Sequence, residues 1–333
     1  MIDGNPSGTA AALRAPSRPI FVIGVPRSGT TVVFNCFAAR PDVAWFPQHL
    51  NRVPNWPSVT LLARLADRFP SARKSIQRSD HSRRWREKAR IGPVEAYPIW
   101  EHYAGSKFLY ESLLGVRPTA DESAGLRRLV RKLQRYQGKD RFATKITGPA
   151  RIGFLTGAFP DAIFVNVIRD GRAVSRSLTK VDFFKNTWRE TSSSWEGVLG
   201  DVDLDRWQTL GRPPLALAAL QWQALIRAAR GEAKAHAPDR YAEVRYEDFV
   251  ADPHEMIDEI ARFCGLPVRP EPHEFLRARV EVRDMNRRSV DLSPSEQSML
   301  DELIGVELAE LGYIDGERGE RERPLVSRPF AGG

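Results

Sequence analysis

The stretch IFVIGVPRSGTTVVFNCFAAR, residues 20–40, decides the fold class of this 333-residue chain. Residues 20–25 form an apolar run, which predicts a strand buried on both faces of a sheet. A helix is predicted over residues 28–40 and ends there because Pro41 cannot continue it. The glycine-bracketed turn between them, G-x-x-x-x-G-T-T over residues 24–31, directs backbone N–H groups and the positive end of the helix dipole toward an anion. The chain therefore begins as an α/β domain with an anion-binding turn.

Strands and helices alternate along the rest of the chain. Apolar runs predict further strands at residues 141–146, 162–168 and 241–246. Helices are predicted at residues 121–136, 150–158, 171–178 and 215–229, after a cap at Asp252, and after a capping box of Ser293 and Glu296. This alternation predicts a parallel sheet that helices cover on both faces. Ligands of such sheets bind at the carboxyl ends of strands, so the residues after Val25, Ile146 and Ile168 are candidates for a site.

The turn after the first strand, residues 25–31, has its cation inside the loop. A nucleotide-triphosphatase P-loop places a Lys directly after the second glycine, where it reaches the β- and γ-phosphates. Here Thr30 takes that position and Arg27 supplies the positive charge. The turn is therefore suited to a phosphate group, but not to a γ-phosphate with magnesium. The alternative is an ordinary strand–helix turn, which the Arg, the Ser and the two Thr of this turn make less favoured.

The turn after the strand at 162–168 carries a second set of polar side chains. Arg169 leaves the carboxyl end of the strand, Gly171 allows the chain to turn, and Ser177 follows Arg169 by eight residues. Arg169 and Ser177 can share one anion, while Asp170 can cap the new helix. The alternative is a local ion pair of Arg169 with Asp170 beside an ordinary surface serine. Together with the first turn, this pattern predicts a ligand with phosphates at two separated positions.

The composition indicates a folded chain with a sizeable core. Hydrophobic residues make up 42% and charged residues 28%, which excludes global disorder. No apolar run is long enough to span a membrane and no secretory signal is evident, so a cytoplasmic protein is expected. Two cysteines, Cys36 and Cys264, exclude a disulfide framework and a cysteine-based zinc site. The net charge of +8 favours a polyanionic partner.

The composition also divides the chain into segments. Residues 1–18 are expected to be a flexible arm and 315–333 a flexible tail, which leaves 19–314 as one domain. Residues 45–140 are expected to form a helical insertion. Within it, residues 64–90 hold ten Lys or Arg against three acidic residues. That stretch could bind an anionic or sugar ligand, bind nucleic acid, or form amphipathic helices with solvated faces. No nucleic-acid-binding motif is present, so no nucleic acid partner is expected.

The two turns, in this order, resemble those of the sulfotransferase superfamily, which uses 3′-phosphoadenosine 5′-phosphosulfate (PAPS). PRSGTT (26–31) is similar to the family's 5′-phosphosulfate loop, and FPDAIFVNVIRDGRAVSRS (159–177) to its 3′-phosphate segment. VRYEDFVADP (244–253) and FCGLP (263–267) are similar to its last core strand and helix. The similarity is greatest to the bacterial and tyrosylprotein-type branches, which share RSGTT and RDGRA. The resemblance implies a P-loop-type three-layer α/β fold with a central parallel sheet and a mainly helical inserted lobe.

The resemblance also implies a set of site residues. Lys145, at the end of the second predicted strand, matches a lysine that acts on the leaving phosphate, and Arg27 is implied to take part in catalysis. Tyr246 lies in the last-strand motif, and Arg287 and Arg288 lie in a late basic segment like the one that closes the donor site in some sulfotransferases. The residues implied to bind the donor are Arg27, Ser28, Gly29, Thr30, Thr31, Arg169, Ser177, Tyr246, Arg287 and Arg288.

The catalytic base is where the chain departs from the tyrosylprotein-type pattern. Those enzymes have a Glu 21 residues after the loop Arg, and the corresponding residue here is Gln48, which cannot take a proton at neutral pH. The neighbouring His49 can, so it is a candidate base, with a structural or substrate-orienting role as the alternative. Glu95 and Glu101 are further candidates, with solvated or Arg-paired carboxylates as the alternative.

The resemblance implies an enzyme that transfers a sulfuryl group from PAPS to a hydroxyl or amine, releases 3′-phosphoadenosine 5′-phosphate (PAP) and requires no metal. The acceptor is expected to be a small molecule, a glycan or a peptide. The helical insertion at 45–140 is expected on the acceptor side, and an anionic acceptor would suit its basic stretch. Two alternatives stay open. One is a non-catalytic polyanion-binding protein on the same fold, and the other is a P-loop kinase of a small metabolite, which Thr30 disfavours.

Overall fold

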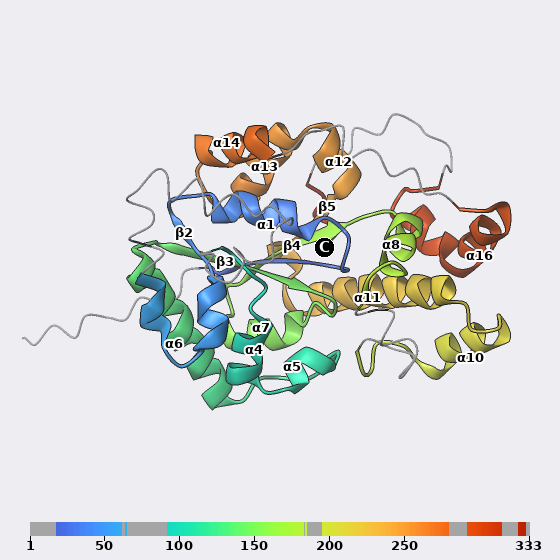
Figure 1. Cartoon of the computed structure of the whole chain (residues 1–333), viewed down its shortest axis with the longest axis horizontal. Helices are drawn as coiled ribbons and strands as arrows, with labels where there is room; N and C mark the ends of the chain where they lie inside the picture. The colour runs from blue at the N-terminus through green and yellow to red at the C-terminus, as the bar shows by residue number, and fades with distance from the viewer. Residues whose placement is uncertain are drawn as a thin grey trace, which may run out of the picture.

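A parallel sheet of five strands runs through the part of the chain that this computed structural model describes, residues 18–61, 64, 92–182, 184, 195–279, 292–314 and 326–330. The strand order is β2 (Val43–Ala44), β3 (Arg141–Thr147), β1 (Ile20–Gly24), β4 (Ile163–Ile168) and β5 (Tyr241–Arg245). Every neighbouring pair is parallel. The carboxyl ends of β1, β3 and β4 therefore lie at one edge, where the turns into α1 and α8 begin (Figure 1).

Four of the five strands confirm the sequence prediction, each within one residue at either end. The edge strand β2 was not predicted. It pairs with β3 at only two positions, Val43 with Arg141 and Ala44 with Phe142. A two-residue strand is too short to show the alternation by which strands are recognised.

Helices cover both faces of the sheet, as predicted (Figure 1). Successive strand side chains point to opposite faces, so Ile20 and Val22 of β1 pack on one side and Phe21 and Ile23 on the other. The first face is covered by α1 (Thr30–Ala38), α12 (Tyr246–Ala251), α13 (Pro253–Phe263) and α14 (Pro270–Arg279). The second is covered by α4 (Tyr97–Ala104), α5 (Lys107–Tyr110), α6 (Ala120–Gln137) and α7 (Ile152–Ala158). The predicted three-layer α/β fold is confirmed.

A third core lies beside the carboxyl edge of the sheet. It joins α8 (Gly171–Leu178), α11 (Pro214–His236) and α16 (Pro294–Glu310), with α10 (Asp201–Thr209) packed against α11. The short helices η1 (Gln48–Arg52), η2 (Pro57–Thr60) and η4 (Pro238–Arg240) complete the described elements. Most of the basic stretch at 64–90 lies outside the described residues.

Helix starts follow the predicted caps, with one correction. Asp170, Asp252 and Ser293 each accept a backbone N–H at a helix start, and Ser293 forms the full capping box with Glu296. The first helix, however, begins at Thr30 and not at residue 28. Gly29 has φ of 93°, in the left-handed region, so the residues before Thr30 belong to the turn.

Part of the predicted flexible tail lies on the sheet. Ser327 forms an antiparallel bridge with Glu243 of β5, and the ring of Phe330 stacks on Tyr241 with centroids 5.8 Å apart. The expectation of a flexible tail is therefore corrected for residues 326–330. Cys36 and Cys264 are both buried and unpaired. Within the described ranges, no helix is long and apolar enough to cross a membrane.

Candidate active site

Two glycines shape the turn after β1. A Cβ on Gly24 would lie 2.6 Å from the carbonyl oxygen of Val167 in β4, so only glycine allows this close approach of the two strands. Gly29 is the N-cap of α1, and no side chain of the described chain caps that helix start. The first-turn amides of α1 therefore have no side-chain acceptor, and they point out at the end of the turn. This is the open helix N-terminus that the sequence predicts for anion binding.

The ring of Tyr246 connects the turn after β1 with the turn after β4. A Cβ on Gly29 would lie 2.1 Å from Cδ2 of Tyr246, so the ring packs directly on the glycine. The guanidinium carbon of Arg169 lies 4.6 Å from the centroid of the same ring, which is a cation–π contact. Arg169 also donates a hydrogen bond to the carbonyl oxygen of Arg27 at 3.1 Å. These predicted donor-binding residues therefore lie together.

Arg27 links the two predicted anion motifs through its side chain. Its Nε donates to the hydroxyl oxygen of Ser177 at 3.0 Å, across 150 residues of sequence. The backbone of Arg27 has φ of 77°, a left-handed conformation that is uncommon for a residue with a side chain. Such a conformation is kept where the surroundings require it, often at a functional site. The first and third turns thus form one polar site at the carboxyl edge.

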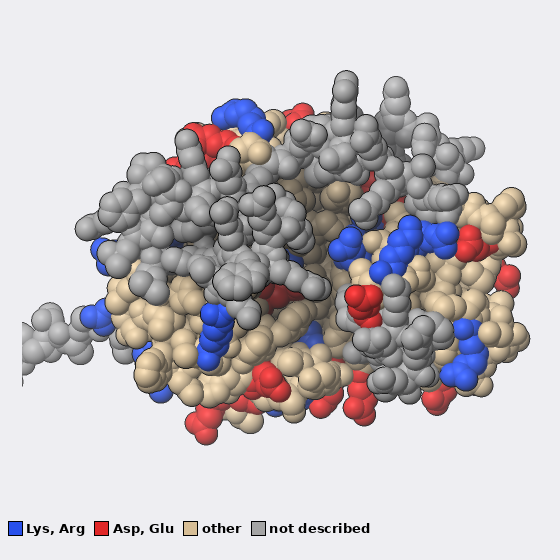
Figure 2. Space-filling model, viewed as in Figure 1, with Lys and Arg blue, Asp and Glu red and all other residues tan. Residues whose placement is uncertain are grey.

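Lys145 extends this site to the end of β3. Its ammonium donates to the hydroxyl oxygen of Thr31 at 2.9 Å and lies 3.3 Å from Oε2 of Glu95. The Lys145 side chain is 13% exposed and that of Glu95 25%, so both reach the surface of the site. Figure 2 shows a hollow near the centre of this face of the molecule, with Lys and Arg side chains along its right side and Asp or Glu side chains also at its edge. The predicted leaving-group lysine and the predicted anion-binding turn after β1 are thus brought together.

Three groups around the end of β3 hold Glu95 in place. Its Oε1 accepts the backbone N–H of Thr147 at 3.0 Å and the Thr147 hydroxyl at 2.6 Å. The hydroxyl of Tyr97 lies 3.4 Å from the same oxygen and donates to the carbonyl oxygen of Thr147 at 2.7 Å. Burial raises the pKa of Tyr97 above its ordinary value, and the charge of Glu95 adds to the effect, so the phenol keeps its proton. Oε1 is thereby engaged, while Oε2 faces Lys145.

The chain matches the model of the Sulfotransferase family over residues 19–270, which include both turns and the ends of β3 and β5. The chain belongs to the sulfotransferase family. The resemblance drawn from the two turns is therefore confirmed.

Known relatives of this sulfotransferase are distant in sequence. Nodulation protein NoeE of Sinorhizobium fredii is 24% identical over 331 residues, which cover 92% of this chain and 69% of that protein. Protein-tyrosine sulfotransferase 1 of Danio rerio is 24% identical over 253 residues, which cover 74% of this chain and about half, 53%, of that protein. The crystal structure of sulfotransferase STF9 from Mycobacterium avium is 18% identical, with a TM-score of 0.56 over 89% of this chain and 77% of that chain. That structure supports the fold.

Of the proposed bases in this sulfotransferase, only Glu95 contacts Lys145 in a described interaction. The Nε2 of His49 donates to the carbonyl oxygen of Val59 at 3.0 Å, and its Nδ1 is buried without a partner in the described chain. Burial lowers the pKa of His49, which keeps the ring neutral, but the remaining lone pair does not reach the surface. Glu101 is exposed on α4. Among the described interactions, none joins His49 or Glu101 to Lys145 or to Glu95.

Gln48 lies next to the segment that leads to Glu95. The backbone N–H of Gln48 donates to the carbonyl oxygen of Gly92 at 2.9 Å, and Val94 donates to Phe46 at 3.1 Å. The position of the family glutamate is thus paired with the chain just before Glu95. Arg287 and Arg288 lie outside the described residues.

The sequence analysis did not identify the residues that hydrogen-bond to the site residues or to their neighbours in the chain. Thr147 and Glu247 each follow a predicted strand end, which is a usable signal. Tyr97 and Tyr313 carry no such signal, because each lies far along the chain from the residue that it contacts, Thr147 and Glu247. Within the described ranges, no three His, Cys, Asp or Glu side chains are grouped so that they could hold a metal ion.

Proposed function

We propose that this sulfotransferase transfers a sulfuryl group from PAPS to a hydroxyl or amine of a small molecule, glycan or peptide. The observation that carries the proposal is that Arg27, Arg169 and Lys145 meet at the carboxyl edge of the sheet, beside the open N-terminus of α1. Three cations and a helix N-terminus in one place suit a ligand with several anionic groups.

The residues of the turns fit the two phosphate groups of such a donor. The hydroxyl of Ser28 is buried and has no partner in the described chain, so the turn has a polar atom in need of one. Arg27, Ser28, Thr30 and Thr31 would hold the 5′-phosphosulfate with the first-turn amides of α1. Arg169 and Ser177 would hold the 3′-phosphate, with Tyr246 fixing the Arg169 guanidinium.

Lys145 and Glu95 are the proposed catalytic residues. The donor supplies a sulfuryl group, whose bond to the phosphate of PAP is exchanged for a bond to the acceptor oxygen or nitrogen. The Lys145 ammonium would stabilise the negative charge on the departing phosphate oxygen. Oε2 of Glu95 would accept the proton of the acceptor group, since Oε1 is engaged by Thr147. Glu95 would thereby do the work of the glutamate that Gln48 replaces.

The donor site is tested by calorimetric titration of the full chain with PAP, with ATP plus magnesium as the comparison ligand. We expect micromolar PAP binding that a chelator does not change and that Arg169→Ala weakens at least about 10-fold, the effect of losing one charged contact. Arg262→Ala is the matched control, because Arg262 is an exposed arginine of α13 paired with Glu259. Absence of PAP binding would contradict the proposal, and tight ATP–magnesium binding would favour the kinase.

A non-catalytic polyanion-binding protein is the second candidate, motivated by Gln48 and the net charge of +8. The contact of Glu95 with Lys145 favours the enzyme, because it supplies a carboxylate where Gln48 cannot. Incubation of the chain with PAPS and a panel of phenols, sugars and peptides decides between them. PAP release that depends on an acceptor supports the enzyme. Salt-sensitive polyanion binding with no sulfated product from any acceptor supports the second candidate.

A further inference from the structure

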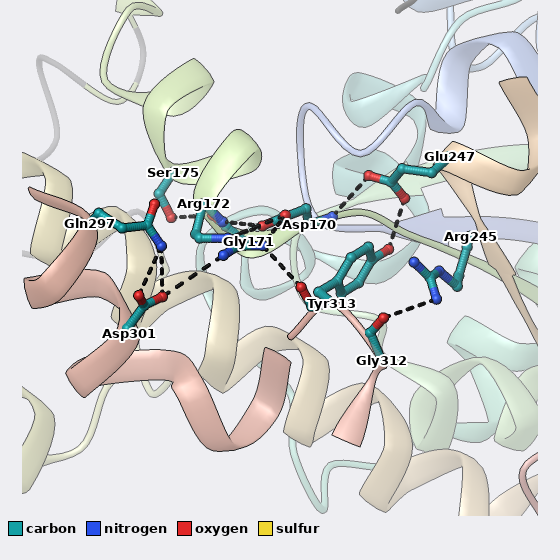
Figure 3. Close-up of polar contacts among 10 residues, drawn as sticks. All are labelled: Asp170, Gly171, Arg172, Ser175, Arg245, Glu247, Gln297, Asp301, Gly312 and Tyr313. Carbon is teal, nitrogen blue, oxygen red and sulfur yellow. Dashed lines mark hydrogen bonds and ion pairs between the residues drawn. The ribbon is translucent and has the colours of Figure 1, made fainter. Parts of the chain in front are cut away.

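Tyr313, just after the end of α16, touches two turns of the proposed donor site (Figure 3). Its hydroxyl donates to Oε2 of Glu247 at 2.9 Å, at the start of α12. Its carbonyl oxygen accepts a hydrogen bond from the guanidinium of Arg172 at 3.0 Å, in the first turn of α8. One residue near the end of the domain thus connects the chain after β4 with the chain after β5.

Glu247 extends this link to the binding residues themselves. Its Oε1 accepts the backbone N–H of Asp170 at 3.2 Å (Figure 3). Asp170 follows Arg169 and Glu247 follows Tyr246, so the bond joins the neighbours of two residues that stack on each other. The position of the Arg169 guanidinium over the Tyr246 ring therefore depends on where Glu247 is held.

Other contacts keep the Tyr313 segment in place without the hydroxyl. The guanidinium carbon of Arg245 lies 4.3 Å from the centroid of the Tyr313 ring, and Arg245 donates to the carbonyl oxygen of Gly312 at 3.3 Å. Arg172 is itself fixed by a 2.8 Å ion pair with Asp170. A Phe at position 313 would keep the ring and backbone contacts and lose only the bond to Glu247.

The Tyr313 hydroxyl remains a donor over the whole working range of pH. Burial raises the pKa of Tyr313 well above its ordinary value, and the charge of Glu247 adds to this. A neutral phenol that donates to a carboxylate makes a stronger hydrogen bond than one between two neutral groups.

We propose that Tyr313 is a positioning residue for the donor site: through Glu247 it aligns Arg169 and Tyr246 for the 3′-phosphate. This inference rests on the proposed PAPS site. Lys145 and Glu95 lie on and beside β3, outside this network, so the effect is expected on donor binding and not on the chemical step.

The test is Tyr313→Phe in the full chain, measured by PAP titration and by steady-state kinetics. PAP affinity is expected to weaken roughly 3- to 10-fold, the size of one net hydrogen bond, and KM for PAPS to rise in proportion. The kcat and the KM of the acceptor are expected to stay near wild type. In a double-mutant cycle, adding Tyr313→Phe to Glu247→Gln should cost little further affinity.

Tyr241→Phe is the matched control. The Tyr241 hydroxyl is also buried and donates to a glutamate, Oε1 of Glu243, at 2.8 Å, but at the amino end of β5. Both variants should lose thermal stability, and only Tyr313→Phe should lose PAP affinity. Wild-type PAP affinity in Tyr313→Phe, or equal weakening in both variants, would overturn the inference and leave the proposed function standing. A wild-type chain that does not bind PAP would instead overturn both.

Discussion

The carboxylate of Glu95 lies 3.3 Å from the ammonium of Lys145, at the edge of the sheet where the turns after β1 and β4 meet. Each group neutralises the other in this arrangement. An anion bound next to Lys145 would compete for its ammonium, because the lysine also reaches Thr31 in the first turn. Donor binding is therefore expected to release Oε2 of Glu95 toward the acceptor. This contact is therefore expected to couple the donor side of the proposed site to its acceptor side.

Glu95→Gln is expected to lower kcat by about 100-fold or more, because the amide cannot take the acceptor proton. PAP affinity should change by less than about threefold, since an amide oxygen can still accept from Thr147. Steady-state rates with saturating PAPS measure the first effect and calorimetry the second. Glu101→Gln, on the exposed side of α4, is the control and should keep the wild-type rate. A Glu95→Gln enzyme with wild-type kcat would remove this carboxylate from the mechanism.

Lys145→Ala is expected to lower turnover strongly while leaving PAP binding largely intact. The ammonium is needed where negative charge grows on the departing oxygen, and its loss should cost about 100-fold or more in kcat. Arg27 and Arg169 would still hold PAP. Lys107→Ala provides the matched control, because Lys107 also pairs with a carboxylate, Glu122, at 2.7 Å, but on α5. If both variants lost rate equally, Lys145 would have no special role.

The predicted part of the fold rests on local signals. Runs of apolar residues and the glycine turns identify β1, β3, β4 and β5 together with the edge at which a ligand is expected to bind. The strand β2 was not predicted, because two residues are too few to form a recognisable pattern. Its described sheet pairing is with β3. Local sequence therefore predicts the strands that build the site, but not the edge strand.

The predicted part of the site is likewise the part that lies at strand ends. Lys145 and Arg169 sit at the ends of β3 and β4, so their meeting follows from the parallel sheet. The proposal of Glu95 rather than His49 as the catalytic base does not follow from the sequence. It depends on hydrogen bonds between Glu95 and Thr147, 52 residues apart, and on the burial of the His49 ring. Such contacts come from packing of the insertion against the sheet.

Gly29→Ala is expected to disrupt the donor site. Its φ of 93° alone costs a side chain about 1–2 kcal/mol, and the new Cβ would lie 2.1 Å from the Tyr246 ring. The ring must then move away from Arg169, so PAP affinity and thermal stability should both fall. Gly200→Ala is the control, because Gly200 has nothing within 4 Å of an added Cβ and no positive φ. PAP binding by Gly29→Ala at wild-type affinity would show that the turn tolerates a displaced ring.

The lowered pKa of His49 predicts how the free energy of unfolding depends on pH. Burial lowers its pKa below the ordinary value of 6.5, and the hydrogen bond to Val59 only partly opposes this. The unfolded chain therefore binds more protons just below pH 6.5, and the stability that His49 contributes is lost as the pH falls from 6.5 through the folded pKa. Denaturant unfolding at pH 7.5 and 5.5 measures the effect, with His49→Gln as the comparison. The variant should lose less stability between the two pH values than wild type. An identical pH dependence in both would mean that His49 does not titrate differently on folding.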